Sequence, residues 1–388
     1  MNILHITGEY PPYILGGLGT YVGDVAQKLY ERGHTVNILV LQGDRATYNQ
    51  VEEPKNTITV TRKKISLEQF SHLSNSTLLA ADIIKKFDLN HFINNPPDII
   101  HVHDWYGALW GAALKHHASI PLVVTSHLPT RAGFTYTGHS INIKLKMQLE
   151  SLAFRSADII VAPSVNVAET LEHEYNINRQ AITVLSNGVD TDFFCPSQKQ
   201  TQYKKKINLV SASRLTEQKG MMYLMDIMHL LVASKLPVNL SIAGTGPLLD
   251  DLRRESKRLH IQNHVKFMGF LNKTHLRELY QDASLFINTS IYEPFGLVVL
   301  ESMATGLPVI SFNQGGIREI IHTGVDGILV PPTDTISMAK IITHYLQNRN
   351  ELLQMRAVAR KIATRYDWRH IVKKLESVYQ KTITNRHI

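Results

Sequence analysis

The stretch "SLFINTSIYEPFGLVVLESMATGLPVISFN", residues 284–313, contains the pattern that decides the fold. Two short apolar runs, 284–290 and 307–313, flank a longer apolar segment that ends at Gly306. Such runs on either side of an apolar helix predict two parallel strands joined by a buried helix. Pro294 is a favourable first helical residue, so we expect the helix to begin there. Two carboxylates flank its first turns, Glu293 and Glu301.

The same alternation recurs on both sides of residues 195–206, a polar stretch that predicts a linker. Strands are predicted before it at 2–7, 35–42, 98–104, 121–127, 158–164 and 181–188, and after it at 207–213, 238–244, 264–270, 284–290, 307–313 and 326–331. Near-continuous apolar strands alternating with helices indicate right-handed parallel units. We therefore expect an α/β protein with two doubly wound, Rossmann-like domains that face a ligand cleft between them.

Length and composition fit this interpretation. A chain of 388 residues suits two domains, and 44% hydrophobic with 19% charged residues is typical of globular proteins. No apolar run reaches the roughly 18 residues that span a bilayer. The first residues, "MNILHITGEYPP", predict a strand and lack the basic start of a signal peptide. The single cysteine, Cys195, allows no internal disulfide, so a cytoplasmic location is expected.

The net charge of +8 is unevenly distributed. Residues 1–195 carry 15 basic and 18 acidic side chains, a balance of −3, and residues 196–388 carry 26 and 15, a balance of +11. The excess gathers at 204–206 and from Arg356 onward. A solvated linker and a charged helix face explain it, and a site for anionic ligands or a peripheral membrane contact is the alternative. Basic stripes interleaved with aromatics are absent, so nucleic acid is not an expected partner.

The second half places cations and carboxylates at predicted strand ends. Arg214 and Lys219 in "SASRLTEQKG" lie at a strand-to-helix turn, where two cations suit a diphosphate. Gly244 in "AGTGP" marks a second glycine turn. Glu293 and Glu301 could bind ligand hydroxyls near the positive end of a helix dipole. Each feature also has a plain structural interpretation, as surface cations or as a charge at a helix terminus.

The first half offers glycines, histidines and one aspartate pair. Gly16 and Gly17 allow close backbone approach at a helix start, although the segment lacks the third glycine of a dinucleotide fingerprint. His101 and His103 alternate on one strand face, but no third ligand has suitable spacing, so no metal is predicted. Asp190-Thr-Asp192 is similar to the Asp-x-Asp of metal-dependent sugar transferases, and a turn role is favoured for it.

Taken together, these residues resemble the retaining glycosyltransferases of family 4, relatives of glycogen and starch synthases. Five segments carry the resemblance in order along nearly the whole chain: "GGLGTYV", "SNGVDTDFF", "RLTEQKG", "EPFGLVVLE" and "YDWRHIVKKLESVY". The resemblance implies the GT-B fold, a nucleoside-diphosphate-sugar donor, retention of anomeric configuration, no divalent metal and no cofactor. It also implies an acceptor domain at 1–195, a donor domain at 207–366 and a helix at 367–388 that returns to the first domain.

Residue roles follow from the matched motifs. The implied catalytic residues are His127, Arg214, Lys219 and Glu293. The donor-binding residues, with the glycine of the second turn included, are Gly16, Gly17, Asp104, Gly244, Phe295, Gly296, Leu297 and Glu301. Glu301 would hold the ribose hydroxyls, the two cations the diphosphate, and His127 the transferred sugar. The backbone N–H groups of 295–297 would cradle sugar and phosphate.

Some features leave alternatives open. "HVHDW" and "GEYPPYILGGLG" resemble the branch that uses ADP- or UDP-glucose, yet Leu15 stands before Gly16 where that branch has a Lys-x-Gly-Gly loop. Glucose is therefore an expectation for the hexose, and the acceptor is a carbohydrate or another hydroxyl compound. A sugar-nucleotide epimerase, a phosphorylase and an inactive sugar-nucleotide-binding protein are the rival functions. The sequence does not indicate an oligomeric state.

Overall fold

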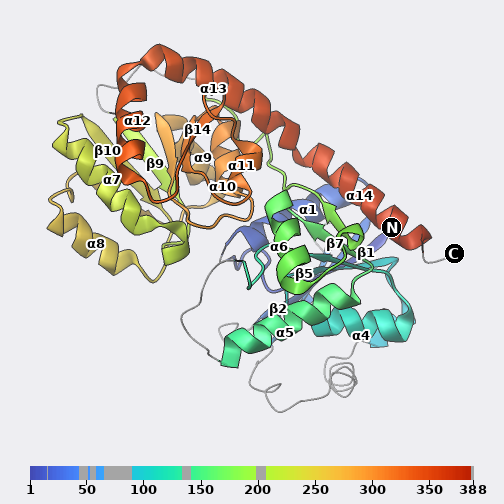
Figure 1. Ribbon diagram of the computed structural model, residues 1–388. Coiled ribbons are helices and arrows are strands. Elements are labelled where there is room, and N and C mark those ends of the chain that lie inside the picture. Colours follow the sequence, from blue (N-terminus) through green and yellow to red (C-terminus); the bar gives the residue numbers. More distant parts are fainter. Residues whose placement is uncertain are drawn as a thin grey trace. The chain divides into compact units, whose positions relative to one another are not determined.

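A computed structural model describes most of the chain and divides it into two compact units (Figure 1). The described residues are 1–14, 16–42, 51–52, 58–64, 90–132, 141–197 and 207–385. Unit 1 comprises Met1–Ser186 and Trp368–Ile388, and unit 2 comprises Asn187–Asp367. Most of the predicted linker, 198–206, lies outside the described residues, as does Leu15.

Unit 1 contains one sheet with the strand order β3-β4-β2-β1-β5-β6-β7-β8. Its strands are β1 (Asn2–Thr7), β2 (Thr35–Gln42), β3 (Val51–Glu52), β4 (Ile58–Lys64), β5 (Ile99–His103), β6 (Leu122–Thr125), β7 (Ile159–Ala162) and β8 (Ile182–Val184). All neighbouring pairs are parallel except β3 with β4. The sequence analysis did not predict β3 and β4.

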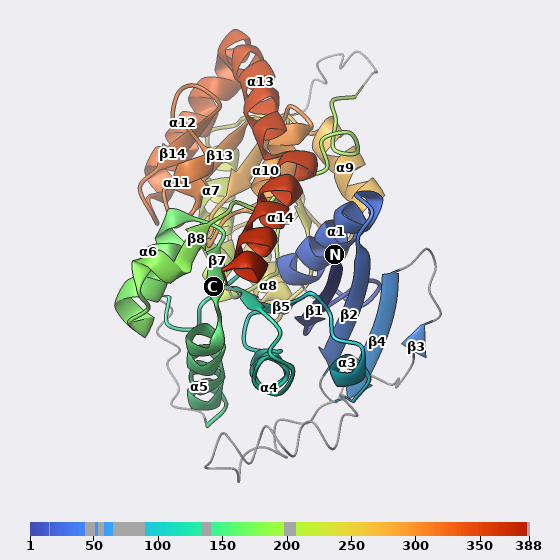
Figure 2. The same ribbon diagram turned by 90° about the vertical axis from the view of Figure 1, so that its right-hand side faces the viewer.

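Helices cover both faces of this sheet (Figure 2). They are α1 (Gly17–Glu31), α3 (Asn90–Asn94), α4 (Ala108–Ala118), α5 (Ile141–Ser156), α6 (Val165–Tyr175) and α14 (Trp368–Thr384). The apolar sides of α4, α5 and α6 form one core with the sheet, and those of α1 and α14 form the other. On α14, Trp368 Nε1 donates to Asp24 Oδ2 of α1 at 3.3 Å. The last helix of the chain therefore completes the core of unit 1.

Unit 2 contains a fully parallel sheet with the order β11-β10-β9-β12-β13-β14. Its strands are β9 (Ile207–Ala212), β10 (Val238–Ala243), β11 (Val265–Gly269), β12 (Leu285–Asn288), β13 (Val309–Phe312) and β14 (Gly327–Val330). Its helices are α7 (Met221–Ala233), α8 (Leu249–Arg258), α9 (Lys273–Asp282), α10 (Leu297–Ala304), α11 (Ile317–Ile320), α12 (Thr335–Gln347) and α13 (Arg349–Ala363). Cores lie on both faces, one with α7 and α12, the other with α9, α10 and α13.

Each sheet has a point where the strand order reverses. In unit 2 the chain proceeds from β9 to β10 and β11, then returns to place β12 on the other side of β9. In unit 1 the corresponding neighbours are β1 and β5. Loops leave the carboxyl ends of two such strands in opposite directions and open a crevice, the usual ligand position in doubly wound sheets.

Two details differ from the sequence-based expectations. Helix α10 begins at Leu297, not Pro294, because Gly296 has φ +111°, a left-handed conformation that cannot continue a helix. Residues 187–195 pack with unit 2, since Val189 and Phe194 belong to its core and Arg360 Nη1 donates to the Phe194 carbonyl at 2.9 Å. The sequence analysis assigned this segment to the first domain.

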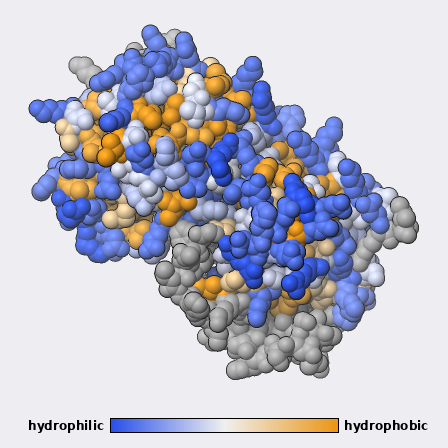
Figure 3. All heavy atoms as spheres, viewed as in Figure 1, coloured by the Kyte–Doolittle hydropathy of each residue, from blue (hydrophilic) through white to orange (hydrophobic). Residues whose placement is uncertain are grey.

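The visible surface is mostly hydrophilic, with apolar side chains exposed between the charged ones (Figure 3). The exposed face of α14 is basic, with Arg369, Lys373 and Lys374 among its exposed residues. Its opposite face is buried, so the positive charge near the end of the chain lies on the exposed face of an amphipathic helix. Within the described ranges, no helix combines the length and apolar character needed to cross a membrane.

Candidate functional site

The turn after β9 brings Lys219 to the end of β12. Residues Glu217–Lys219 form a single 3-10 turn, and Gly220 follows at φ +59°. A Cβ atom on Gly220 would lie 2.0 Å from the Thr289 carbonyl oxygen, so only glycine allows this approach. Thr289 Oγ1 in turn donates to the Lys219 carbonyl at 3.1 Å. The strand-order reversal of unit 2 therefore places a cation beside the loop that carries Glu293.

Lys219 and Glu293 form a largely buried ion pair. Lys219 Nζ lies 2.6 Å from Glu293 Oε2, and the two side chains are 15% and 10% exposed. The Ser290 hydroxyl lies 3.1 Å from the same carboxylate oxygen and 2.8 Å from Asn288 Oδ1. A lysine held in this way presents a compact positive charge at the strand end, where a phosphate oxygen can replace part of the carboxylate contact.

The Glu293 backbone is fixed by two glycines that the sequence analysis missed. Gly316 N donates to the Glu293 carbonyl at 2.9 Å. Gly315 has φ +58°, and a Cβ atom there would lie 2.1 Å from the same oxygen. The signal in the sequence is the pair in "NQGGI", directly after a predicted strand. A glycine pair at a strand end indicates a close backbone approach.

Helix α10 starts at the same edge of the sheet and carries Glu301. The first backbone N–H groups of the helix, from Leu297 on, lie at the carboxyl end of β12, where they can bind anionic groups. Glu301 is 7% exposed and lies beside Tyr280 of α9. Burial and then the Glu301 carboxylate raise the pKa of Tyr280 well above its usual value. Phe295 is buried in the core, so only its backbone is at this edge.

Arg214 and Gly244 lie on adjacent loops of the same edge. Gly244 has φ +127°, and a Cβ atom there would lie 1.9 Å from the Ser213 carbonyl oxygen. The loops after β9 and β10 are thus in direct contact. Arg214 is exposed and forms no ion pair with any residue in the described ranges. It shares an edge with Lys219, but it is not held in place as Lys219 is.

In unit 1, Asp104 and His127 meet at the ends of β5 and β6. Asp104 has φ +54°, and its Oδ1 accepts from the backbone N–H groups of His127 at 2.5 Å and Leu128 at 3.4 Å. Burial raises the pKa of Asp104 to about 7, against the opposing effect of the His127 N–H. Burial lowers the pKa of the His127 imidazole to about 3. These two predicted site residues are therefore in contact through the backbone of His127.

The glycine loop after β1 is held by a residue that the sequence analysis did not select. Gly16 N donates to Glu9 Oε2 at 3.0 Å, and Glu9 N donates to Thr7 Oγ1 at 3.3 Å. Helix α1 begins at Gly17, which is exposed. Glu9 thus fixes the start of the helix, and its place soon after the first strand is the signal that could have revealed it.

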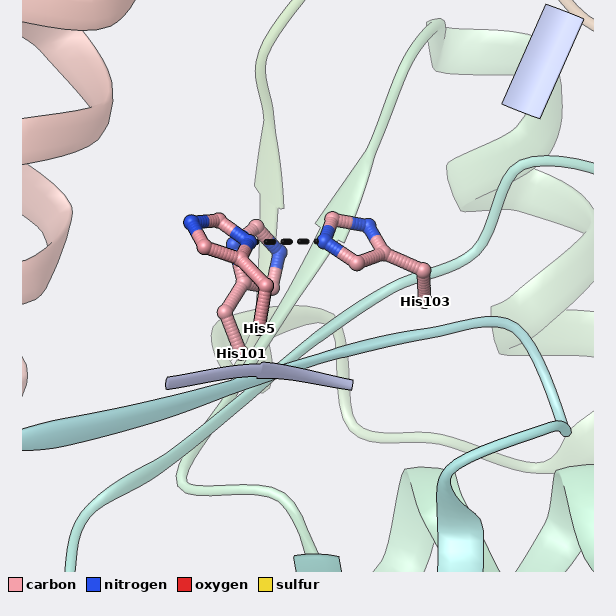
Figure 4. Close-up of side chains that lie close together, drawn as sticks. All are labelled: His5, His101 and His103. Atoms are coloured by element: carbon pink, nitrogen blue, oxygen red, sulfur yellow. Dashed lines mark hydrogen bonds between the residues drawn. The ribbon is translucent and has the colours of Figure 1, made fainter. Parts of the chain in front are cut away.

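A third histidine, His5, joins the predicted pair His101 and His103 (Figure 4). His5 lies on β1 opposite His101 on β5, and the three rings bring ligand atoms within 4.8 Å of one another. The sequence analysis found no third ligand of suitable spacing, and His5 was missed because strand pairing supplies a neighbour that sequence spacing does not show. Yet five of the six ring nitrogens contact another side chain, and only His5 Nε2 has no partner among the described residues. His101 contacts Tyr379 and Thr125, each at 2.6 Å, and His5 Nδ1 lies 2.9 Å from His103 Nε2. Two histidine nitrogens bound to one tetrahedral zinc ion would lie roughly 3.3 Å apart, given Zn–N bonds of about 2.0–2.1 Å. The 2.9 Å between His5 Nδ1 and His103 Nε2 therefore fits a hydrogen bond better.

Nearly the whole chain matches known proteins. A family model described as Glycosyltransferase Family 4 matches residues 15–193, and one described as Glycosyl transferases group 1 matches residues 196–362. An uncharacterized glycosyltransferase of Methanocaldococcus jannaschii is 30% identical to this chain over 98% of each. This chain belongs to glycosyltransferase family 4. The expected family and enzyme class are confirmed.

Solved structures confirm the GT-B fold of this family 4 glycosyltransferase. Sucrose-phosphate synthase from Thermosynechococcus elongatus superposes with a TM-score of 0.82 at 20% identity, covering 99% of this chain and 100% of that one. Anabaena HepE in complex with UDP-glucose gives 0.76 at 21% identity, covering 98% and 100%. Among curated proteins, a glycogen synthase of Mycobacterium tuberculosis is 26% identical over 98% of this chain and 94% of its own.

The Asp190-Thr-Asp192 motif of this family 4 glycosyltransferase, which is similar to a metal site in sequence, forms a turn. Asp190 Oδ1 accepts from the backbone N–H groups of Phe193 at 2.9 Å and Asp192 at 3.2 Å. An aspartate that bonds the backbone two and three residues ahead stabilises a turn. The carboxylate oxygen is thus used within the turn, as the sequence analysis favoured.

Proposed function

We propose that this enzyme is a retaining glycosyltransferase that moves a hexose, glucose in preference, from a nucleoside-diphosphate sugar to a hydroxyl acceptor without a divalent metal. The observation that carries the proposal is the Lys219–Glu293 pair at the point where the strand order of unit 2 reverses. Glucose is favoured because one relative is named a glycogen synthase and one similar structure holds UDP-glucose. With its single cysteine the chain needs no oxidising compartment, and we propose a cytoplasmic location.

The reaction breaks the bond between the anomeric carbon and a phosphate oxygen. Negative charge then builds on the diphosphate, and in this proposal Lys219, Arg214 and the first N–H groups of α10 stabilise it. The acceptor oxygen forms the new bond on the same face of the sugar, and its proton passes to the leaving phosphate oxygen. The side-chain cations Lys219 and Arg214, of which Lys219 is held by Glu293, perform the charge stabilisation that Mg²⁺ supplies in other transferases.

The remaining candidate residues have binding roles in this proposal. On unit 2, Glu293 binds hydroxyls of the transferred sugar, Glu301 binds the ribose, and the turn at Gly244 lies near the diphosphate. On unit 1, Gly16 and Gly17 let the backbone approach the diphosphate closely, and Gly17 offers the N–H group because that of Gly16 is bonded to Glu9. Two further unit 1 residues, His127 and Asp104, bind the sugar or the acceptor.

A screen of nucleotide sugars tests the donor. We expect ADP-glucose or UDP-glucose to raise the melting temperature most, since a ligand at 100 times its Kd stabilises by about 2.7 kcal/mol. With that donor, release of free nucleoside diphosphate should increase when a carbohydrate acceptor is added, and an α-linked donor should give an α-linked product by proton NMR. Diphosphate release that does not respond to any acceptor would favour an epimerase or an inactive binding protein.

Chelation tests metal independence. Initial rates measured in excess EDTA should equal those in excess Mg²⁺, because side-chain cations lie where the diphosphate is proposed to bind. Complete loss of activity in EDTA, restored by Mg²⁺ or Mn²⁺, would contradict this part of the proposal. The variant Asp190→Asn would then show whether that carboxylate is a ligand.

A further inference from the structure

Three imidazoles of unit 1 form a continuous hydrogen-bonded chain that ends at the candidate site. His5 Nδ1 lies 2.9 Å from His103 Nε2, and His103 Nδ1 lies 3.1 Å from His127 Nε2 (Figure 4 shows the first contact). His5 and His103 are fully buried on β1 and β5, and His127 is half-buried just after β6. The chain thus runs from the interior of the unit to the carboxyl edge of its sheet.

All three rings are neutral near pH 7. Burial lowers the pKa of His5 and His127 to about 3 and that of His103 well below its usual value. A neutral imidazole has one N–H donor and one bare nitrogen acceptor. The three protons must therefore point the same way along the chain, and only two arrangements satisfy both hydrogen bonds.

The inner end of the chain distinguishes the two arrangements. His5 Nε2 is buried and has no hydrogen-bond partner among the described residues. If the protons pointed inward, this nitrogen would carry a buried N–H with no acceptor, which folded proteins rarely tolerate. If they point outward, it is only a bare acceptor.

We infer that the N–H groups of the three linked imidazoles point outward, toward the edge of the sheet, and that this fixes His127 in the Nδ1–H tautomer. His5 Nδ1–H then donates to His103 Nε2, and His103 Nδ1–H donates to His127 Nε2. The Nδ1 atom of His127, to which no described residue is bonded, becomes a neutral hydrogen-bond donor at the strand end. A histidine side chain in water favours the Nε2–H tautomer. The hydrogen bonds of the buried His5 and His103 reverse that preference at His127.

This inference rests on the proposed function for its consequence. A neutral N–H at this position donates to an oxygen of the transferred sugar or of the acceptor, and it places no positive charge beside the developing cation of the sugar ring. His5 and His103 act through His127 and are positioning residues. His101 is not part of the chain, because Tyr379 and Thr125 occupy its two nitrogens.

The ¹⁵N chemical shifts of histidine rings test the tautomer directly. In wild-type protein labelled at histidine, the His127 signals, assigned by their loss in His127→Gln, should show a protonated Nδ1 and a bare Nε2 at pH 7.5. Protonated Nε2 at His127 overturns the inference. This measurement needs neither donor nor acceptor, so it is independent of the proposed function.

A pair of variants at His5 tests the direction of the chain. The carboxylate of His5→Asp can only accept, so His103 Nε2 must become the donor and His127 should switch to the Nε2–H form. The amide of His5→Asn can still donate to His103, so His127 should keep its wild-type tautomer. His116→Asp, on the exposed end of α4, is the matched control for adding a carboxylate in place of a histidine. The wild-type spectrum decides the matter even where His5→Asp does not fold.

Turnover with UDP-glucose, or with whichever nucleotide sugar the screen selects, tests the consequence. We expect His5→Asp to lower kcat on the order of 10²-fold, the typical loss of one transition-state donor, with KM changed far less. His5→Asn should recover most of that loss. A switched tautomer with unchanged kcat would overturn the role of the chain, whereas a wild-type enzyme inactive with every nucleotide sugar would contradict only the proposed function. Zinc bound at one equivalent and lost in His103→Gln would make the rings metal ligands and also overturn the inference.

Discussion

Lys219 and Glu293 form an ion pair with each other in the structure. In the proposed reaction, both side chains contact the bound donor. We expect Lys219→Met to lower kcat on the order of 10²–10³-fold, with a smaller change in donor Kd, because charge on the leaving diphosphate is greatest in the transition state. Steady-state kinetics and calorimetric titration with the donor measure the two effects. The exposed Lys266→Met is the control.

A double variant separates this catalytic loss from a loss of stability. Lys219→Met alone leaves the buried Glu293 carboxylate without its cation, which should lower the melting temperature. Adding Glu293→Gln removes that charge, so Lys219→Met/Glu293→Gln should regain thermal stability but not turnover. Recovery of both properties would show that Lys219 is only structural.

The raised pKa of Asp104 predicts that the stability of unit 1 depends on pH in an unusual way. Its pKa is raised from 3.8 to about 7 in the folded state, chiefly by burial, so the folded state holds a proton that the unfolded chain has lost. The stability it contributes is complete below about pH 4 and is lost as pH rises through about 7. The neutral histidines His5 and His127 act in the opposite sense, losing stability as pH falls from 6.5 toward 3.

Asp104→Asn isolates the carboxyl group from the histidines. Asn keeps an oxygen for the His127 N–H, and both proteins share the same imidazoles. Between pH 5 and pH 8, wild type should lose unfolding free energy relative to Asp104→Asn. Tryptophan fluorescence in urea measures this in unit 1 alone, because Trp105, Trp110 and Trp368 all belong to that unit. Parallel curves for the two proteins would show that Asp104 does not titrate in this range.

At the scale of elements, the loop after β13 supports the loop after β12. Gly315→Ala would place a methyl group 2.1 Å from the Glu293 carbonyl oxygen, so the backbone that carries Glu293 has to move. We expect turnover to fall at least tenfold, and misplacement of a positioned group can cost about 10²-fold. Steady-state rates with the selected donor measure this.

Gly324→Ala is the matched control for Gly315→Ala. Gly324 also has a positive φ, +81°, but a Cβ atom there meets nothing within 4 Å. Gly324→Ala therefore introduces the backbone penalty of a non-glycine residue at positive φ without a collision between the new methyl group and a carbonyl oxygen. Equal loss of activity in the two variants would mean that strain alone, and not the position of Glu293, explains the effect.

At the scale of the whole molecule, unit 1 is built from two distant parts of the chain and unit 2 from one continuous part. Helix α14 contributes Trp368, Ile371, Val372, Leu375 and Tyr379 to the core beside α1. Each large buried apolar side chain is worth roughly 1.5–3 kcal/mol, against a total stability of about 5–15 kcal/mol. Deleting residues 368–388 should therefore unfold unit 1 and leave unit 2 folded, as limited proteolysis would show by a surviving fragment of 187–367.

Two adjacent positions of α14 give a sharper version of this test. Leu375 is 1% exposed and Lys374 is exposed. Leu375→Asp should leave the same fragment of 187–367 in limited proteolysis as the deletion does, because a charge in the core cannot be solvated, whereas Lys374→Asp should not. Unfolding of both units by Leu375→Asp would show that unit 2 depends on unit 1.

The sequence by itself determined the features that depend on local hydrophobic pattern and on residue type. Apolar runs of strand length separated by helical periodicity predicted the parallel strands of both sheets apart from β4, and five ordered motifs, among them those around Lys219 and Glu293, indicated the family. These features are local because backbone geometry fixes the hydrophobic periods, and a glycine or cation acts within a few residues of its position.

Only the tertiary structure decided which strands are neighbours, and with them the contacts of His5 and Gly315. His5 lies 98 residues from His103 in sequence, yet the order of the sheet places β1 beside β5 and the two rings 2.9 Å apart. Gly315 supports Glu293 because β12 and β13 are adjacent, and residues 187–195 join unit 2 because its core buries Phe194. Spacing along a chain does not reveal such contacts, since strand order follows from how helices cross over the sheet and bury its faces.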